Sequence, residues 1–101
     1  MPLKHWIIEL EGARILVSRA SRRGQVESFA VVLLAWTDAG WECASRYDCA
    51  HGFGHRDGIG RSAGPLYKQS FAGLTYAELF HHALRDFQKN HAAYIAHYLA
   101  H

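Results

Sequence analysis

Features that would mark a secreted, membrane-spanning or disordered protein are scarce in this sequence. Its 101 residues include only two cysteines and two prolines, too few for a disulfide-bonded scaffold or a proline-rich extended chain. The longest apolar run, Phe29–Trp36, has eight residues, whereas a membrane-spanning helix needs about 20. Glu9 and Glu11 interrupt the apolar core that a signal peptide would need near the start. We therefore expect one soluble, cytoplasmic domain over residues 1–101, without a membrane partner.

An excess of charge of one sign is also lacking. Lys and Arg number 11 and Asp and Glu number 9, which leaves a net charge of +2 when the histidines are neutral. Hydrophobic residues make up 50% of the chain, and a domain of this size can bury enough of them to fold without a metal or a disulfide. Composition therefore indicates a globular domain, and its function has to be inferred from local motifs.

Residues 4–48 have the features of β-strands. The run Phe29–Trp36 is apolar on both faces, as is typical of a central strand covered on two sides. Thr37–Gly40 follows as a hairpin loop, which would place Trp36 opposite Trp41. Strict alternation from that pair predicts further cross-strand pairs: Leu34 with Cys43, Val32 with Ser45, Leu33 with Ala44 and Val31 with Arg46.

The C-terminal part of the chain predicts one long helix over residues 75–99. Thr75 and Glu78 have the spacing of a capping box, in which each side chain bonds a backbone N–H at the helix start. Apolar side chains then recur at three- and four-residue intervals, which is typical of a helix with one buried face. Before this helix, residues 49–73 contain six of the nine glycines, which predicts a long loop.

These elements together predict an α+β fold: an antiparallel sheet of about four strands with one long C-terminal helix packed on one face. We expect Leu84 and Phe87, in the middle of the apolar stripe, to be buried against the sheet. Phe29, Val31 and Leu33 make the second face of the central strand apolar, and one helix covers only one face. We therefore expect a homodimer, since monomers rarely expose an apolar patch above a few hundred Å².

One segment, residues 46–57, carries groups suited to metal-free phosphodiester chemistry without a cofactor. Two histidines can act as base and acid in one turnover, because an imidazole titrates near neutral pH. An aspartate can orient one imidazole, and an arginine can bind phosphate through a bidentate fork. The predicted catalytic residues are His51, His55 and Asp48, and the predicted phosphate- or substrate-binding residues are Arg46, Arg56 and Tyr47.

Two other interpretations of the same segment stay open. His51 and His55 have the spacing of two metal ligands on a helix, although the glycines between them disfavour a helix. Cys49 or Asp48 would complete a set of three ligands. In the structural interpretation, the polar side chains instead hydrogen-bond the backbone of the loop, which has no regular partners.

Residues 46–55 have the pattern R-Y-D-x-x-H-G-x-x-H, which resembles the signature of a group of small uncharacterised prokaryotic proteins. In that group the segment follows a β-hairpin and precedes a C-terminal helix, and Asp86, Asn90 and Tyr94 also fit its pattern. Some similar short proteins resemble toxin components of toxin–antitoxin loci. The resemblance implies action on RNA and an antitoxin-like partner.

Two functions therefore compete. The first is a toxin-like RNA-acting enzyme or phosphodiesterase that uses a histidine pair. The alternative is a non-enzymatic interaction module, a homodimer, in which residues 46–57 have a structural role. An enzyme should hold both imidazoles exposed in one cleft within reach of Arg46, whereas a structural role would bury them against backbone carbonyls.

Overall fold

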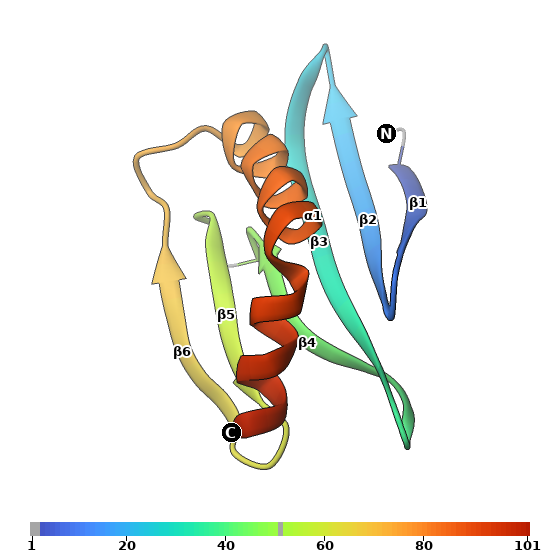
Figure 1. Cartoon of the computed structure of the whole chain (residues 1–101). Helices are drawn as coiled ribbons and strands as arrows, with labels where there is room; N and C mark the ends of the chain where they lie inside the picture. Colours follow the sequence, from blue (N-terminus) through green and yellow to red (C-terminus); the bar gives the residue numbers. More distant parts are fainter. Residues whose placement is uncertain (1–2, 51) are drawn as a thin grey trace.

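The computed structural model of the chain describes residues 3–50 and 52–101 as six antiparallel strands followed by one helix (Figure 1). Strands adjacent in the sequence are adjacent in the sheet, which is therefore a meander. The helix lies across one face of the sheet and contacts the third, fourth and fifth strands. The elements are β1 (Leu3–Leu10), β2 (Ala13–Arg22), β3 (Gln25–Thr37), β4 (Gly40–Asp48), β5 (His55–Gly60), β6 (Gly64–Ser70) and α1 (Tyr76–Ala100).

The α+β class with one helix on an antiparallel sheet is confirmed, but the prediction of about four strands was wrong. The segment 49–73, predicted as a loop, contains β5 and β6. Two of its glycines, Gly58 and Gly60, allow close packing inside a regular strand. A Cβ atom at Gly58 would lie 2.4 Å from the ring of Tyr67 on β6, and one at Gly60 would lie 2.9 Å from the backbone of His101.

The β3–β4 hairpin follows the predicted register only near its turn. Trp36 lies opposite Trp41 and Leu34 lies opposite Cys43, as predicted. The register then shifts at a β-bulge between Leu33 and Leu34, where one strand has an extra residue and the side chains beyond it change partners. The remaining predicted pairs were therefore wrong, and the pairs in the structure are Leu33 with Ser45, Val32 with Arg46 and Val31 with Tyr47.

The core lies between α1 and the sheet. The predicted capping box is present at the helix start: Thr75 Oγ1 accepts from the Glu78 N–H, and Glu78 Oε1 accepts from the Thr75 N–H. Phe87 is fully buried as predicted, whereas Leu84 is only half-buried. In the described part of the chain, no helix is long and apolar enough to cross a membrane.

Phe29, Val31 and Leu33 do not lie on an uncovered face, contrary to the prediction. They are buried on the α1 side, where the Phe29 ring lies 5.9 Å from the ring of Phe80. The opposite face, called here the open face, carries no second layer in residues 3–50 and 52–101, since every element except α1 belongs to the sheet. Alternate positions of β3, including Val32, therefore face away from α1.

Two cross-strand rows describe the open face from β1 to β6. On the first three strands the first row is apolar and the second is mixed, whereas most of the charged residues of both rows lie on the last three strands. The first row is Ile7, Leu16, Val32, Arg46, Asp57 and Lys68, and the second is His5, Ser18, Ala30, Asp48, His55 and Ser70. The open face therefore has an apolar half over β1–β3 and a charged half over β4–β6.

Candidate functional site

The charged half of the open face brings three of the predicted site residues together. Antiparallel pairing places Arg46 opposite Asp57 and Asp48 opposite His55, on the adjacent strands β4 and β5. Lys68 on β6 lies opposite Asp57. These five side chains, called here the charged cluster, share one face because residues two apart on a strand point to the same side.

His55 is the buried centre of the charged cluster, with 1% of its side chain exposed. Its Nε2 lies 2.6 Å from Asp48 Oδ1 and 3.7 Å from Asp57 Oδ1. Its Nδ1 lies 3.3 Å from the carbonyl oxygen of Phe53, and the rings of the two residues lie 5.5 Å apart. The imidazole is therefore held at both nitrogens and covered by an aromatic ring.

Arg46 and Lys68 contact the two carboxylates and are more exposed to solvent than they are. Arg46 Nε donates to Asp57 Oδ2 at 3.0 Å and lies 3.3 Å from Asp48 Oδ2. Lys68 Nζ lies 3.5 Å from Asp57 Oδ1 and 3.3 Å from His55 Nε2. Burial alone would lower the pKa of Arg46, but the hydrogen bond to Asp57 and the charges of both carboxylates outweigh it and raise that pKa.

Tyr47 lies on the other side of the sheet and fastens α1 to β4. Its side chain is buried, and its hydroxyl donates to Asp86 Oδ2 at 2.6 Å. The same carboxylate accepts from Asn90 Nδ2 at 2.8 Å and from the Tyr94 hydroxyl. Burial and the bond to Asp86 raise the pKa of Tyr47, and the same two causes raise that of Tyr94 to about 12.

Asp86 is the acceptor at the centre of this second network. Burial alone would raise its pKa, but the hydrogen bonds from Tyr47, Tyr94 and Asn90 outweigh that cost and hold the pKa below its usual value. The R-Y-D tyrosine and the D-x-x-x-N-x-x-x-Y residues of α1 therefore form one sheet-to-helix contact. This geometry gives these motif residues a structural role.

Arg56 is also on the α1 side, away from Arg46. Its Nη1 donates to Ser45 Oγ at 3.1 Å and its Nη2 donates to the Tyr67 hydroxyl at 2.9 Å, while its guanidinium lies 4.9 Å from the centroid of the Tyr94 ring. Burial would lower the pKa of Arg56, but the bond to Tyr67 and neighbouring tyrosines raise it. No acidic side chain pairs with Arg56 within residues 3–50 and 52–101.

The predicted histidine pair and the predicted metal ligands have different outcomes. His51 lies outside the described residues, so its role stays a prediction. Cys49 is turned away from the charged cluster, because its Sγ lies 3.4 Å from the backbone N of Phe29 on β3. The structure brings together a different set of metal-ligand types, with ligand atoms within 4.8 Å of one another: Asp48, His55 and Asp57.

Sequence reasoning gave no role to Asp57 or Lys68. Asp57 lies in the segment that was singled out, and the spacing of His55 and Asp57 is that of neighbours on one strand face. A strand prediction for residues 55–60 would have grouped them. Lys68 carries no comparable signal, since its place beside Asp57 depends on the register of β5 and β6.

These observations define an α+β protein in which a six-stranded antiparallel meander carries one C-terminal helix on one face and a charged cluster on the other. The chain belongs to the family described as domain of unknown function DUF7718, whose family model matches residues 1–101. No curated protein and no solved structure matches the chain. The resemblance to toxin components stays a prediction.

Proposed function

We propose that this protein is a non-enzymatic interaction module that pairs with a second copy of itself through the apolar half of the open face. The observation that carries this proposal is the row Ile7, Leu16 and Val32, which is aligned across three strands and is not covered by α1, the one helix within residues 3–50 and 52–101. Ile7 is exposed and Leu16 and Val32 are half-buried, and contiguous apolar patches that remain accessible to solvent mark protein interaction sites.

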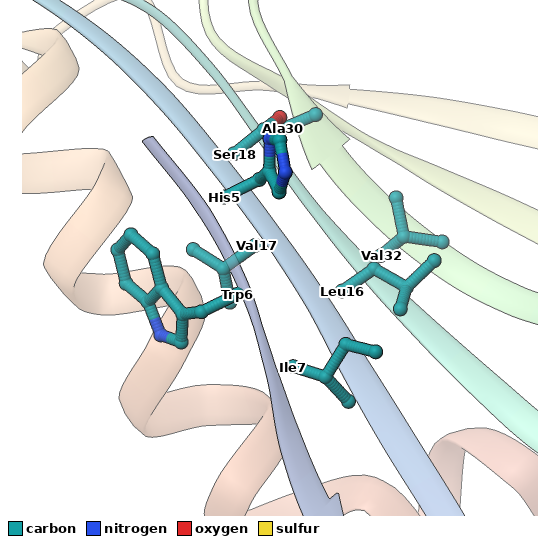
Figure 2. A pocket seen from close by; sticks show the side chains of 8 residues that line it. All are labelled: His5, Trp6, Ile7, Leu16, Val17, Ser18, Ala30 and Val32. Atoms are coloured by element: carbon teal, nitrogen blue, oxygen red, sulfur yellow. The ribbon is translucent and has the colours of Figure 1, made fainter. Parts of the chain in front are cut away.

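The apolar half has the shape of a docking surface. A hollow of about 410 Å³ lies over β1, β2 and β3. Ile7, Leu16 and Val32 project to the same side of the sheet, whereas Trp6 projects towards α1 (Figure 2). Ile7 is 53% exposed and, at the end of β3, Trp36 is 62% exposed, so burying these side chains against a partner would be favourable.

The dimensions of the molecule fit a second copy as the partner. The molecule measures 42 × 25 × 21 Å, so its broad side offers on the order of 1,000 Å² and the apolar half about half of that, which is the size of a weak, concentration-dependent interface and smaller than the roughly 800 Å² per partner of a standard one. A two-fold axis brings the same patch of both copies together, so one apolar half is sufficient for both sides. The flanking charges of Glu9 and Arg14 neutralise each other at 2.7 Å, which avoids repulsion between the copies.

The burial of His55 favours the structural interpretation of residues 46–57 over histidine-pair catalysis. An acid–base residue has to reach the proton that it transfers, and the imidazole of His55 is 1% exposed and enclosed by Asp48 and Phe53. Cleavage of RNA, phosphodiester hydrolysis and an antitoxin-like partner stay predictions. Incubation of the protein with mixed single-stranded RNA tests them, and cleavage that is lost on His55→Ala without unfolding would overturn the non-enzymatic proposal.

Light scattering coupled to size-exclusion chromatography tests the pairing. We expect the wild-type protein to have the mass of two chains at high concentration and Ile7→Lys to have the mass of one. Leu99→Lys is the matched control, because Leu99 is 51% exposed but lies on α1, and we expect it to remain paired. A wild-type mass of one chain at every concentration, or equal loss of pairing in both variants, would contradict the proposal.

A further inference from the structure

We propose that the charged half of the open face is a binding site for a small amphipathic anion, with Arg46 and Lys68 holding its carboxylate or phosphate group. The site lies over β4–β6, beside the apolar half but distinct from it, and the inference goes beyond the pairing of two copies. It combines two observations: a hollow with apolar walls, and unused hydrogen-bond donors at its polar end.

The hollow has the size and lining of a small-molecule site. Its volume is about 550 Å³, within the range of roughly 300–1,000 Å³ that is typical of ligand pockets. Such pockets combine apolar walls with a few polar groups that orient the ligand. The apolar wall contains Ile59, Pro65 and Leu66, and the polar end contains Arg46, Asp57 and Lys68.

The count of donors and acceptors in the charged cluster favours an anion. Each oxygen of Asp48 and of Asp57 already faces a nitrogen of Arg46, His55 or Lys68. Arg46 uses only its Nε, and neither terminal nitrogen of its guanidinium forms a hydrogen bond within residues 3–50 and 52–101. Every carboxylate oxygen of the cluster therefore has a nitrogen neighbour, whereas the terminal nitrogens of Arg46 have no acceptor in the described part of the chain, so a ligand that supplies acceptor oxygens would complement the cluster.

Exposure of the charged groups leads to the same conclusion. The side chains of Arg46 and Lys68 are 49% and 41% exposed, whereas those of Asp48 and Asp57 are 12% and 15% exposed. A ligand that approaches from the hollow therefore meets the cations before the carboxylates. The buried carboxylates fix the guanidinium at its Nε, which leaves its outer edge oriented for a bidentate contact with carboxylate or phosphate.

A divalent metal would bind the carboxylates and the imidazole of the same cluster, whereas an anion would bind its cations. Asp48, His55 and Asp57 are suitable ligand types, but Lys68 Nζ already lies 3.3 Å from His55 Nε2 and 3.5 Å from Asp57 Oδ1. A metal ion would have to displace this ammonium group and compete with Arg46 for both carboxylates. The geometry therefore favours the anion, and metal binding is an opposing outcome of the test.

An amide NMR titration with hexanoate, hexyl phosphate and hexylammonium tests the site. We expect hexanoate or hexyl phosphate to shift the resonances of β4–β6 in a saturable manner, and hexylammonium to leave them unchanged. Their relative affinities distinguish a carboxylate ligand from a phosphate ligand. Loss of a charge-assisted hydrogen bond should weaken binding about tenfold in Arg46→Gln and in Lys68→Gln, whereas Lys89→Gln on α1 should bind as the wild type does.

Lys68→Gln keeps the test decisive if Arg46→Gln disturbs folding, because Lys68 lies on the edge strand β6 with its side chain partly exposed. Unchanged affinity in a folded Lys68→Gln variant would overturn the proposal, as would wild-type protein that binds neither anion. Saturable binding of Zn²⁺ that is lost in Asp57→Asn would also overturn it, by assigning the cluster to a cation. The titration does not measure the mass of the protein in solution. A failure to bind anions is therefore distinguishable from a failure of two copies to pair.

Discussion

Tyr47→Phe isolates the hydrogen bond that joins β4 to α1. The substitution removes the hydroxyl that donates to Asp86 Oδ2 at 2.6 Å and leaves the ring in its place, where it packs 5.1 Å from the ring of Phe87. A hydrogen bond to a charged group contributes about 1.5–3 kcal/mol. Because Asn90 and Tyr94 still donate to the carboxylate, we expect a loss of about 1.5–2 kcal/mol, near the lower end of that range.

Urea denaturation near neutral pH, followed by circular dichroism, measures this loss. Tyr76→Phe is the matched control, since the Tyr76 ring packs against Phe29 while its hydroxyl forms no hydrogen bond within the described residues. We expect the control to remain within about 0.5 kcal/mol of the wild type, as is usual for substitutions that remove no buried contact. An equal free energy of unfolding in Tyr47→Phe and in the control would show that the hydrogen bond to Asp86 does not stabilise the fold.

The difference in free energy of unfolding between the wild type and Tyr47→Phe should also depend on pH, which gives a second check. The hydrogen bonds lower the pKa of Asp86 below its ordinary value of 3.8. A carboxyl group with a lowered pKa in the folded state contributes stability that is fully present above the ordinary value and is lost as the pH falls through the folded value. The gap between wild type and Tyr47→Phe should therefore narrow in strong acid, and a constant gap would mean that the ionised carboxylate is not involved.

Two further substitutions, each with a control substitution, test the packing. Phe87→Ala should lower the free energy of unfolding by about 3–5 kcal/mol, because Phe87 is fully buried. Leu99→Ala, at an exposed position, should change it little, and similar urea midpoints for the two variants would contradict the packing of α1. Gly58→Ala should cost about 1 kcal/mol, since its Cβ would lie 2.4 Å from the half-exposed Tyr67 ring and would displace the hydroxyl that accepts from Arg56. Gly73→Ala meets no atom within 4 Å, and an equal effect there would argue against close packing between β5 and β6.

Local signals were sufficient to predict the helix and the residue pairs next to the turn of the β3–β4 hairpin. The capping box at Thr75 and the apolar periodicity of α1 depend on residues close in sequence, and the pairing of Trp36 with Trp41 follows from a short turn. These interactions are local, so their residue types alone predict them. The candidate segment at residues 46–57 was also found in this way, because its charged and histidine side chains are concentrated in a short stretch.

The bulge in the β3–β4 hairpin decided how the R-Y-D residues are divided between the two faces. Without it, Arg46 would lie opposite Val31, whereas the structure places Tyr47 there and Arg46 opposite Val32. A shift of one residue exchanges the faces of every later side chain on the strand. Tyr47 consequently reaches Asp86 on α1, and Arg46 and Asp48 join the charged cluster on the open face.

Local residue patterns were therefore sufficient to predict the class of fold, the helix and the segment that contains the candidate site. Packing between distant parts of the chain decided that Gly58 and Gly60 belong to a strand, because each has a close neighbour that is remote in sequence. It also decided that Lys68 completes the charged cluster with Asp57, through the register of β5 and β6. Strand pairing joins residues by their position across the sheet, and that position depends on bulges and packing that no local pattern contains.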